Sequence, residues 1–157
     1  MLKPALLYKK ELEEKFINKL YSDEYFFYTG YDVTSLPEIA AKENYYQYAI
    51  VDNDVVIGYF AYYIDRISDT VCNFGLYSFD KGNFIIGLDV GKKLKELIKN
   101  HHRIEWRVID GNPVKKHYDK FCQRYNGNIV CLHDVTKNLS GNYVNEYIYE
   151  IINNRTN

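Results

Sequence analysis

Cysteine and histidine are the residues best able to bind a metal or to act as a nucleophile, and this chain of 157 residues has few of them. A structural zinc site needs four ligands, usually in two closely spaced pairs. None of the three cysteines forms a CxxC pair, and the histidines form neither an HExxH nor an HxH motif: Cys72, Cys122, Cys131, His101, His102, His117 and His133. We therefore expect no metal site, and we expect Cys122 and Cys131 to be small buried apolar residues.

A strand followed by a capped helix is indicated between residues 103 and 127, RIEWRVIDGNPVKKHYDKFCQRYNG. Apolar and charged side chains alternate over 103–109, the period of a strand with one buried face. Asn112 is a good helix N-cap, and the proline after it is favoured at the first helical position. The helix carries an apolar stripe to about residue 124. Tyr118 lies on this stripe, and the pattern alone would make it a core residue.

The elements before this pair are predicted to be a three-stranded antiparallel meander and a helix. Strand patterns cover 47–52, 55–64 and 70–79, and the first two are joined by a polar turn. Gly58, inside the second strand, suggests a close approach of another backbone. The period then becomes helical from about Leu88 to Asn100, because apolar residues recur at i, i+4, i+7 and i+8.

The two ends of the chain complete the prediction. An amphipathic helix is expected over 8–21 and a short helix over 36–42, with an irregular aromatic stretch between them. Two further strands are expected over 128–135 and 143–152. Together the elements predict an α/β fold with a central mixed sheet of about six to seven strands flanked by helices, in a single domain over residues 1–157.

Composition excludes some functional classes. Twenty basic and 21 acidic residues give a net charge of −1, which argues against a dedicated nucleic-acid-binding protein. No run approaches 18 apolar residues and the N-terminal apolar stretch is too short for a signal peptide, so we expect a cytoplasmic chain that does not enter a membrane. The 17 tyrosines and eight phenylalanines agree either with codon bias in an AT-rich genome or with an aromatic-lined ligand site.

The order of these elements resembles the GCN5-related N-acetyltransferase (GNAT) family. Residues 103–127 resemble the fifth strand of the family and the Asn-Pro/Asn-x-x-Ala helix that follows, which carries a tyrosine about two turns in. The hairpin YAIVDNDVVIGYFAYY is similar to the second and third strands, and residues 127–151 are similar to the last two. The resemblance implies a GNAT-like acyl-CoA N-acyltransferase fold over about residues 47–151.

The resemblance also implies acetyl-CoA as a co-substrate, with its pyrophosphate held by backbone N–H groups at a helix N-terminus. The family motif Gln/Arg-x-x-Gly-x-Gly/Ala is not matched: anchoring it on Gly91 places Asp89 at the other glycine, and anchoring it on Gly87 places Ile85 there. The residues expected to contact the co-substrate are Phe79, Ile86, Gly87, Leu88, Asp89, Val90, Gly91, Asn112 and Lys115. Lysines of the two helices could meet its phosphates or lie on solvated faces.

The chemistry that the resemblance implies is direct attack of an amine on the thioester, so that proximity and orientation supply most of the rate. Tyr118 matches the tyrosine that protonates the leaving thiolate, although it follows Asn112 by six positions where seven is usual. Glu105 and His117 are candidates for a general base, beside a chain of water molecules. The aromatic residues from Tyr25 to Tyr31 either line the acceptor site or pack in the core.

The expected function is therefore acetyl transfer from acetyl-CoA to a small-molecule or protein amine, by an acyltransferase that is a monomer or homodimer. The unmatched phosphate-binding motif favours an alternative, a GNAT-fold binding or regulatory module without acetyl transfer. A third hypothesis is an unrelated α+β ligand-binding domain. The sequence does not identify the acceptor.

Overall fold

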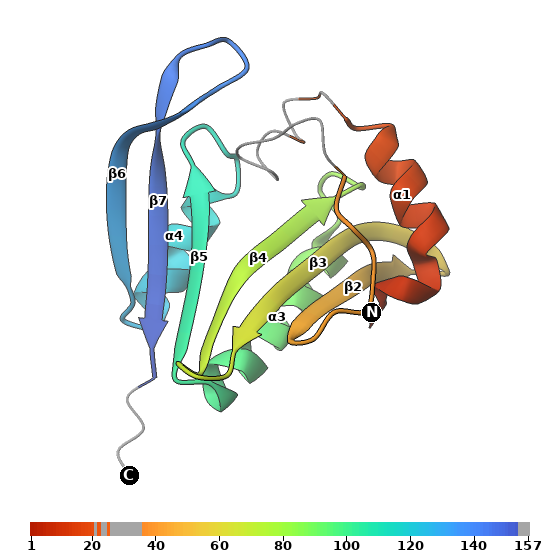
Figure 1. Ribbon diagram of the computed structural model, residues 1–157, viewed down its shortest axis with the longest axis horizontal. Helices are drawn as coiled ribbons and strands as arrows, with labels where there is room; N and C mark the ends of the chain where they lie inside the picture. Colours follow the sequence, from red (N-terminus) through yellow and green to blue (C-terminus); the bar gives the residue numbers. More distant parts are fainter. Residues whose placement is uncertain (21, 23–24, 26–35, 154–157) are drawn as a thin grey trace.

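Seven strands form a single mixed sheet in the computed structural model, which describes residues 1–20, 22, 25 and 36–153. Their order across the sheet is β1-β2-β3-β4-β5-β7-β6 (Figure 1). β4 and β5 are parallel, and every other neighbouring pair is antiparallel. The strands are β1 (Leu2–Pro4), β2 (Tyr45–Asp52), β3 (Val55–Asp65), β4 (Thr70–Ser78), β5 (Arg103–Ile109), β6 (Asn128–Lys137) and β7 (Tyr143–Ile152).

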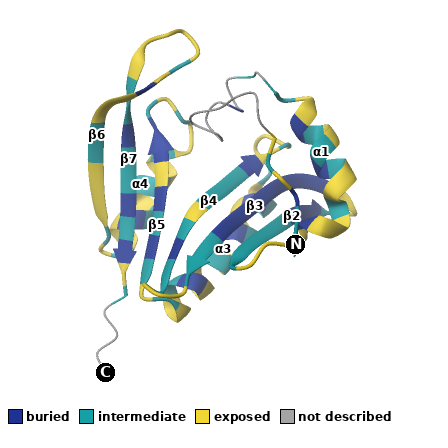
Figure 2. Cartoon of the chain, in the orientation of Figure 1, coloured by how far each residue is buried: buried dark blue, intermediate teal, exposed yellow. Residues whose placement is uncertain are grey.

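Helices cover both faces of the sheet. The 3₁₀ helix η1 (Ala5–Tyr8) leads into α1 (Lys9–Ile17), which packs on one face, whereas α3 (Phe84–Asn100) and α4 (Lys115–Arg124) pack on the other (Figure 1). β3 lies between the two layers, so residues 56–62 are all buried (Figure 2). Burial on both faces explains why this strand is a nearly continuous apolar run. In the described part of the chain, no helix has the length and apolar character needed to cross a membrane.

Side chains alternate between two separate apolar clusters, as the pleat of a strand requires. On β3, Phe60 and Tyr62 face α3, while Tyr59 and Ala61 face α1. Gly58 makes the close approach expected of it, since a Cβ there would lie 2.8 Å from the carbonyl oxygen of Tyr77. The sheet is therefore packed tightly at its centre, and its outer strand β6 is largely exposed (Figure 2).

The parallel pair β4 and β5 separates almost at once. Only Thr70 and Val71 pair with β5, opposite Arg103 and Ile104. The register of β4 on β3 shifts just beyond this point, and Asn73 in the irregular stretch has a left-handed backbone with φ +52°. A bulge of this kind bends the strand that carries it. Beyond the two paired residues the strands diverge (Figure 1), and we call residues 72–78 and 105–109 the splayed ends.

The structure confirms the predicted α/β class, with seven strands where six to seven were expected, and it corrects three of the expected helices, of which α4 is described with the site below. The helix expected from about Leu88 begins at Phe84, because the Asn83 side chain caps it by accepting a hydrogen bond from the N–H of Ile85 at 3.0 Å. The short helix expected over 36–42 does not form. Instead the Gln47 side chain accepts a hydrogen bond from the N–H of Ala40 and donates one to the carbonyl oxygen of Glu38, so these backbone groups bond to a strand residue rather than within a helix.

Candidate functional site

The splayed ends of β4 and β5 are the part of the sheet where backbone groups face a neighbouring strand without pairing to it. Parallel strands normally exchange evenly spaced hydrogen bonds along their whole length. Here the ladder between β4 and β5 stops after Val71 and Ile104. Strand edges of this type can bind an extended ligand through main-chain hydrogen bonds. The divergence therefore defines a candidate site between the two halves of the sheet.

The N-terminus of α3 follows the splayed end of β4 after a short turn. The Ser78 hydroxyl donates to the carbonyl oxygen of Asp80 at 2.8 Å, and the Asn83 side chain donates to the Asp80 carboxylate at 2.9 Å. Helix geometry leaves the N–H groups of Phe84 and Ile86 without an intrahelical acceptor. Such an N-terminus favours anions, but the Asp80 carboxylate already supplies a negative charge beside it.

The structure places the segment 86–91 inside α3, in contrast to the expected phosphate-binding loop. From Gly87 onwards the N–H groups lie within the regular helix, where each has an intrahelical acceptor. Ile86 and Val90 are buried against the sheet, and Leu88 is exposed. The side chain of Asp89 pairs with the amino group of Met1. Of the six residues, only Ile86 lies in the first turn, so the segment does not form a loop that could wrap a phosphate.

Phe79 is part of the α1 side of the core. Its ring centre lies 5.1 Å from that of Phe16 in an edge-on contact and 5.2 Å from that of Tyr77 in a tilted one. Its N–H donates to the carbonyl oxygen of Ile57 at 2.9 Å. Tyr25 belongs to the same cluster and is fully buried. For this one residue the core interpretation of the segment 25–31 is correct, while residues 26–31 lie outside the described residues.

The turn from β5 into α4 brings Asn112 and Lys115 together. Asn112 was expected to cap the helix, but α4 begins only at Lys115, with Val114 at its N-cap position and no side-chain cap. The Asn112 side-chain oxygen instead accepts a hydrogen bond from the N–H of Val114 at 3.1 Å, which closes the turn before the helix. Lys115 lies 3.9 Å from the centre of the Tyr147 ring and 3.3 Å from the Asp119 carboxylate. The ammonium group is thus held beside the end of β5 by two neighbours.

Tyr118 lies on the inner face of α4, packed against the sheet. Its ring makes edge contacts with Trp106 and Tyr149, both at 6.2 Å between ring centres. Burial raises the pKa of the Tyr118 phenol to about 12. The phenol is therefore protonated throughout the physiological pH range and is suited to donating a proton rather than to accepting one.

Trp106 is a candidate that its sequence pattern alone did not reveal. It lies on β5 at the splayed end, stacked on Tyr149 at 5.1 Å. Its indole Nε1 is buried and has no hydrogen-bond partner among the residues that the structure describes. A buried N–H without a partner costs about 1–3 kcal/mol, and this unpaired donor at the splayed end makes Trp106 a candidate site residue. The only signal in the sequence was that it is the single tryptophan of the chain.

The two candidates for a general base lie in different surroundings. Glu105 is on the splayed end of β5, where Arg103 binds its carboxylate at 2.9 Å. It also lies near Cys72 of β4. Burial raises the pKa of the Cys72 thiol, and the negative charge of Glu105 raises it further. His117 is exposed on α4. Glu105 is thus the candidate that the fold places beside the divergence.

Comparison with solved structures identifies the fold. No family model matches the sequence, and no curated protein matches it. The microcin C7 self-immunity acetyltransferase MccE, solved with acetyl-CoA and AMP, has a TM-score of 0.69 at 16% identity over 96% of this chain and 91% of its own. The protein smu.2055 from Streptococcus mutans UA159 has a TM-score of 0.67 at 18% identity over 97% of this chain and 98% of its own.

A probable acetyltransferase is also similar, with a TM-score of 0.55 at 13% identity over 70% of this chain, which spans only 63% of that protein. Several of the neighbours are GNAT acetyltransferases. The seven-stranded mixed sheet with its helices on both faces is therefore the fold of the GCN5-related N-acetyltransferases, as the sequence resemblance implied.

Proposed function

We propose that this protein is an N-acetyltransferase that transfers an acetyl group from acetyl-CoA to an amine. The observation that carries the proposal is the separation of β4 from β5 after two residue pairs, with the N-termini of α3 and α4 following the two splayed ends. It is supported by the fold shared with acetyltransferases, one of which was solved with acetyl-CoA.

The residues at this site suit a direct transfer. The amine nitrogen forms a bond to the acetyl carbon, and the bond from that carbon to sulfur breaks, so the amine must lose a proton and the sulfur must gain one. In the proposal Tyr118 donates the proton to the sulfur, which its raised pKa permits because the phenol stays protonated. Backbone N–H groups of the splayed end of β4 polarise the acetyl carbonyl.

Binding of the co-substrate is assigned to groups on both sides of the divergence. The free N–H groups of Phe84 and Ile86 at the start of α3 would receive the pyrophosphate. Asn112 and Lys115 would contact the co-substrate from the start of α4, and the unpaired Trp106 Nε1 offers a donor to one of its amide carbonyls. Phe79 and the segment from Gly87 to Gly91 would shape this side of the site without wrapping the phosphates.

The acceptor is an amine of a small molecule or of a protein. Glu105 is the candidate for the group that takes up the amine proton, since it lies on β5 beside the divergence and is partly exposed. A chain of water molecules leading to Glu105 is the form of general-base catalysis that fits this arrangement best.

A specific observation favours the second candidate function, a GNAT-fold binding or regulatory module. The Asp80 carboxylate is held at the N-terminus of α3 by Asn83, where acetyl-CoA would bring its pyrophosphate. The negative charges of the Asp80 carboxylate and of the pyrophosphate would repel each other, and the repulsion would weaken binding of acetyl-CoA. In a binding module that uses no CoA the carboxylate would instead stabilise the helix through its dipole.

Release of free thiol from acetyl-CoA, measured against a panel of small amines and peptides with free N-terminal amines, tests the proposal. Acceptor-dependent thiol release, with a matching gain of 42 mass units on the acceptor, is the result expected of an acetyltransferase (an acetyl group replacing hydrogen adds about that mass). Binding of acetyl-CoA without acceptor-dependent release across the panel would favour the binding module.

A further inference from the structure

The vertex where β4 and β5 meet lies at the opposite end of these strands from the candidate reaction site. Two residue pairs, Thr70 with Arg103 and Val71 with Ile104, form the whole ladder between the two halves of the sheet. Strands rise about 3.3 Å per residue, so the seven residues of the splayed end of β4 extend roughly 23 Å beyond the ladder. Over that length a tilt of about 5° at the vertex moves the far end by about 2 Å.

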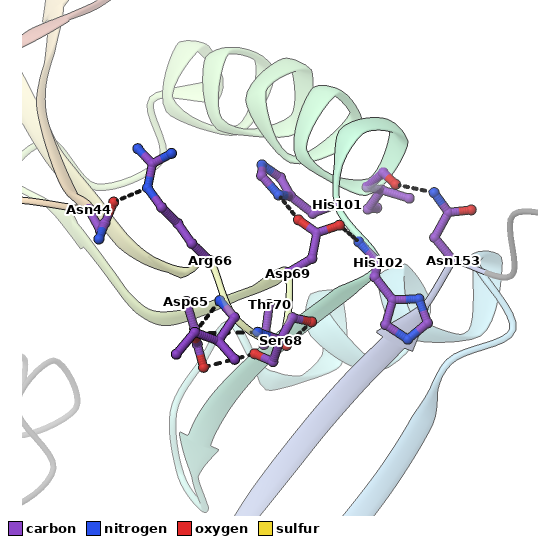
Figure 3. A network of polar contacts seen from close by, with 11 residues as sticks. Asn44, Asp65, Arg66, Ser68, Asp69, Thr70, His101, His102 and Asn153 are labelled. Carbon is purple, nitrogen blue, oxygen red and sulfur yellow. Dashed lines mark hydrogen bonds and ion pairs between the residues drawn. The ribbon is translucent and has the colours of Figure 1, made fainter.

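One residue, Asp69, binds three successive residues on the other side of this vertex. Its carboxylate contacts Nδ1 of His101 at 2.7 Å and accepts a hydrogen bond from the N–H of His102 at 2.8 Å (Figure 3). Its carbonyl oxygen accepts from the N–H of Arg103 at 3.2 Å. Because both carboxylate oxygens and the carbonyl are used, Asp69 ties the start of β4 to the end of α3 and to the start of β5.

The groups around Asp69 fix it from both directions. Asp65 closes the preceding turn by accepting from the N–H of Ile67 at 2.9 Å and from the Ser68 hydroxyl at 2.8 Å. Behind His102, Asn153 at the end of β7 donates its N–H to the His102 carbonyl at 2.7 Å and its side-chain amide to Ile98 at 2.8 Å (Figure 3). The vertex is therefore braced by polar contacts from α3, β5 and β7, with Asp69 at their centre.

We propose that Asp69 is a positioning residue that sets the angle at which β4 and β5 separate, and through that angle the affinity of the site for acetyl-CoA. The second part rests on the proposed function, whereas the first part does not. The carboxylate acts at a distance because a small rotation at the short ladder is amplified along the splayed ends. A displacement of 1 Å at a reacting centre can cost about a hundredfold in rate.

Asp69→Gly is the decisive variant, because Asp69 has a left-handed backbone with φ +47° that glycine adopts without strain. It removes the carboxylate and leaves the turn free to keep its shape. Asp54→Gly is the matched control: Asp54 is exposed in the turn between β2 and β3 and has φ +63°. Asp69→Asn keeps one acceptor oxygen and should give an intermediate effect.

The separation of the two halves is measured without any ligand, by pulsed electron resonance between spin labels at residues 10 and 120. Lys10 on α1 and Lys120 on α4 are both exposed, and each is replaced by cysteine to carry a label. Cys72 and Cys131 are replaced by serine, and Cys122 is kept because it is buried, so that only the two new sites react. We expect Asp69→Gly to shift or broaden the distance distribution by at least about 2 Å, and Asp54→Gly to leave it unchanged. An unchanged distribution in Asp69→Gly overturns the inference.

Calorimetric titration with acetyl-CoA of the same variants without labels supplies the second readout. The dissociation constant should rise at least about tenfold in Asp69→Gly and less in Asp69→Asn, with Asp54→Gly like the wild type. A shifted distance with unchanged affinity contradicts the link to binding. If the wild type itself binds no acetyl-CoA, the proposed function fails, and the label distances still decide whether Asp69 sets the separation.

Discussion

The burial of Tyr118 agrees both with a core residue and with the proposed proton donor. Tyr118 lies among the rings of Trp106 and Tyr149, and this burial is what raises its pKa to about 12. The sequence pattern placed it on an apolar stripe, and the family resemblance placed it at a catalytic position. The structure makes the two compatible, because a phenol against the core stays protonated and can still lie at the inner end of a site.

Tyr118→Phe removes the hydroxyl and keeps the ring, so it should lower kcat by about 10²- to 10⁴-fold while leaving the dissociation constant of acetyl-CoA within about twofold. Because the pKa is raised, the wild-type rate should not fall through loss of this proton until the pH approaches 12. Steady-state rates and calorimetry measure the two effects.

Tyr125→Phe is the matched control, since Tyr125 ends the same helix and packs on Phe121. It should leave kcat unchanged. If Tyr118→Phe weakened binding and rate by the same factor, or if both variants behaved alike, the hydroxyl of Tyr118 would have a structural role only.

Single residues show where sequence reasoning reaches its limit. The turn at Asn112 could be predicted, because a side chain that bonds a backbone N–H two residues on acts locally. The start of α4 at Lys115 could not, and Asn112 is not its cap. Asp69 could not be recognised, since its partners His101 and His102 are about 32 positions away and meet it only once β4 and β5 are paired. The unpaired Nε1 of Trp106 likewise depends on the packing of α4, which no local pattern specifies.

At the scale of elements, the start of α3 is the point where prediction and structure differ most. The sequence pattern predicts a helix from about Leu88, whereas α3 begins at Phe84. The chain uses Asn83 as the N-cap, which follows a glycine in a left-handed conformation, Gly82 with φ +82°. The added turn buries Ile86 against the sheet. This gain in burial depends on tertiary packing, which a local capping rule does not include.

Gly87→Ala tests the new boundary of α3. A Cβ at Gly87 would meet nothing within 4 Å, and alanine in the interior of a helix is more stable than glycine by about 0.5–1 kcal/mol. The variant should therefore raise Tm by about 1–4 °C in a thermal melt and leave acetyl-CoA binding intact. A loss of binding without stabilisation would mean that this segment is the phosphate loop.

Gly58→Ala provides the opposite control. Its Cβ would lie 2.8 Å from the Tyr77 carbonyl oxygen and 3.0 Å from Cδ1 of Ile50. Overpacking of this kind costs about 1–3 kcal/mol, so Tm should fall. A rise in Tm for Gly87→Ala together with a fall for Gly58→Ala would show that the melt reports the packing at each site.

Asp80→Asn tests the charge at the N-terminus of α3. Removing the carboxylate should tighten acetyl-CoA binding about two- to fivefold at low salt, because its repulsion of the pyrophosphate is lost. The same change should lower stability by about 0.3–1 kcal/mol, because a negative charge there favours the helix dipole. Calorimetry and denaturant unfolding measure the two changes, with Asp54→Asn as the control. Weaker binding in Asp80→Asn would show that the carboxylate assists the ligand.

At the scale of the whole molecule, the order of the elements was sufficient to predict a mixed sheet with helices on it. Periods of two and 3.6 residues are local, so the strands and helices could be located from the chain alone. The extent of pairing between β4 and β5 could not, since it follows from a bulge at Asn73 and from contacts between distant turns. The candidate site depends on that pairing, which local sequence periods do not specify.

Buried phenols in both halves of the sheet predict a limit to stability in alkali. Burial raises the pKa of Tyr62 and of Tyr149, assisted by hydrogen bonds with Tyr48 and Asp119, and it raises the pKa of Tyr118 as well. These groups bind their protons more tightly when folded, so the stability that they contribute is complete below the ordinary tyrosine value of about 10 and is lost as the pH rises above it.

Denaturant unfolding and tyrosinate absorbance followed from neutral to strongly alkaline pH measure this limit. The free energy of unfolding should decline above a pH of about 10, and part of the tyrosinate signal should emerge only with loss of structure. Titration of all the tyrosines while the protein stays folded would contradict the burial described for Tyr62, Tyr118 and Tyr149.

The central claim, that the divergence of β4 and β5 is an acetyl-CoA site, is tested most directly by a thermal melt with acetyl-CoA. A ligand that binds only the folded state stabilises it by about 2.7 kcal/mol at a hundredfold excess over its dissociation constant, which raises Tm by roughly 5–10 °C in a domain of this size. ATP, which offers phosphates without the pantetheine arm, is the control. A rise in Tm with acetyl-CoA and a smaller one with ATP is the predicted result; no rise at millimolar acetyl-CoA, or an equal rise with both, would contradict the claim.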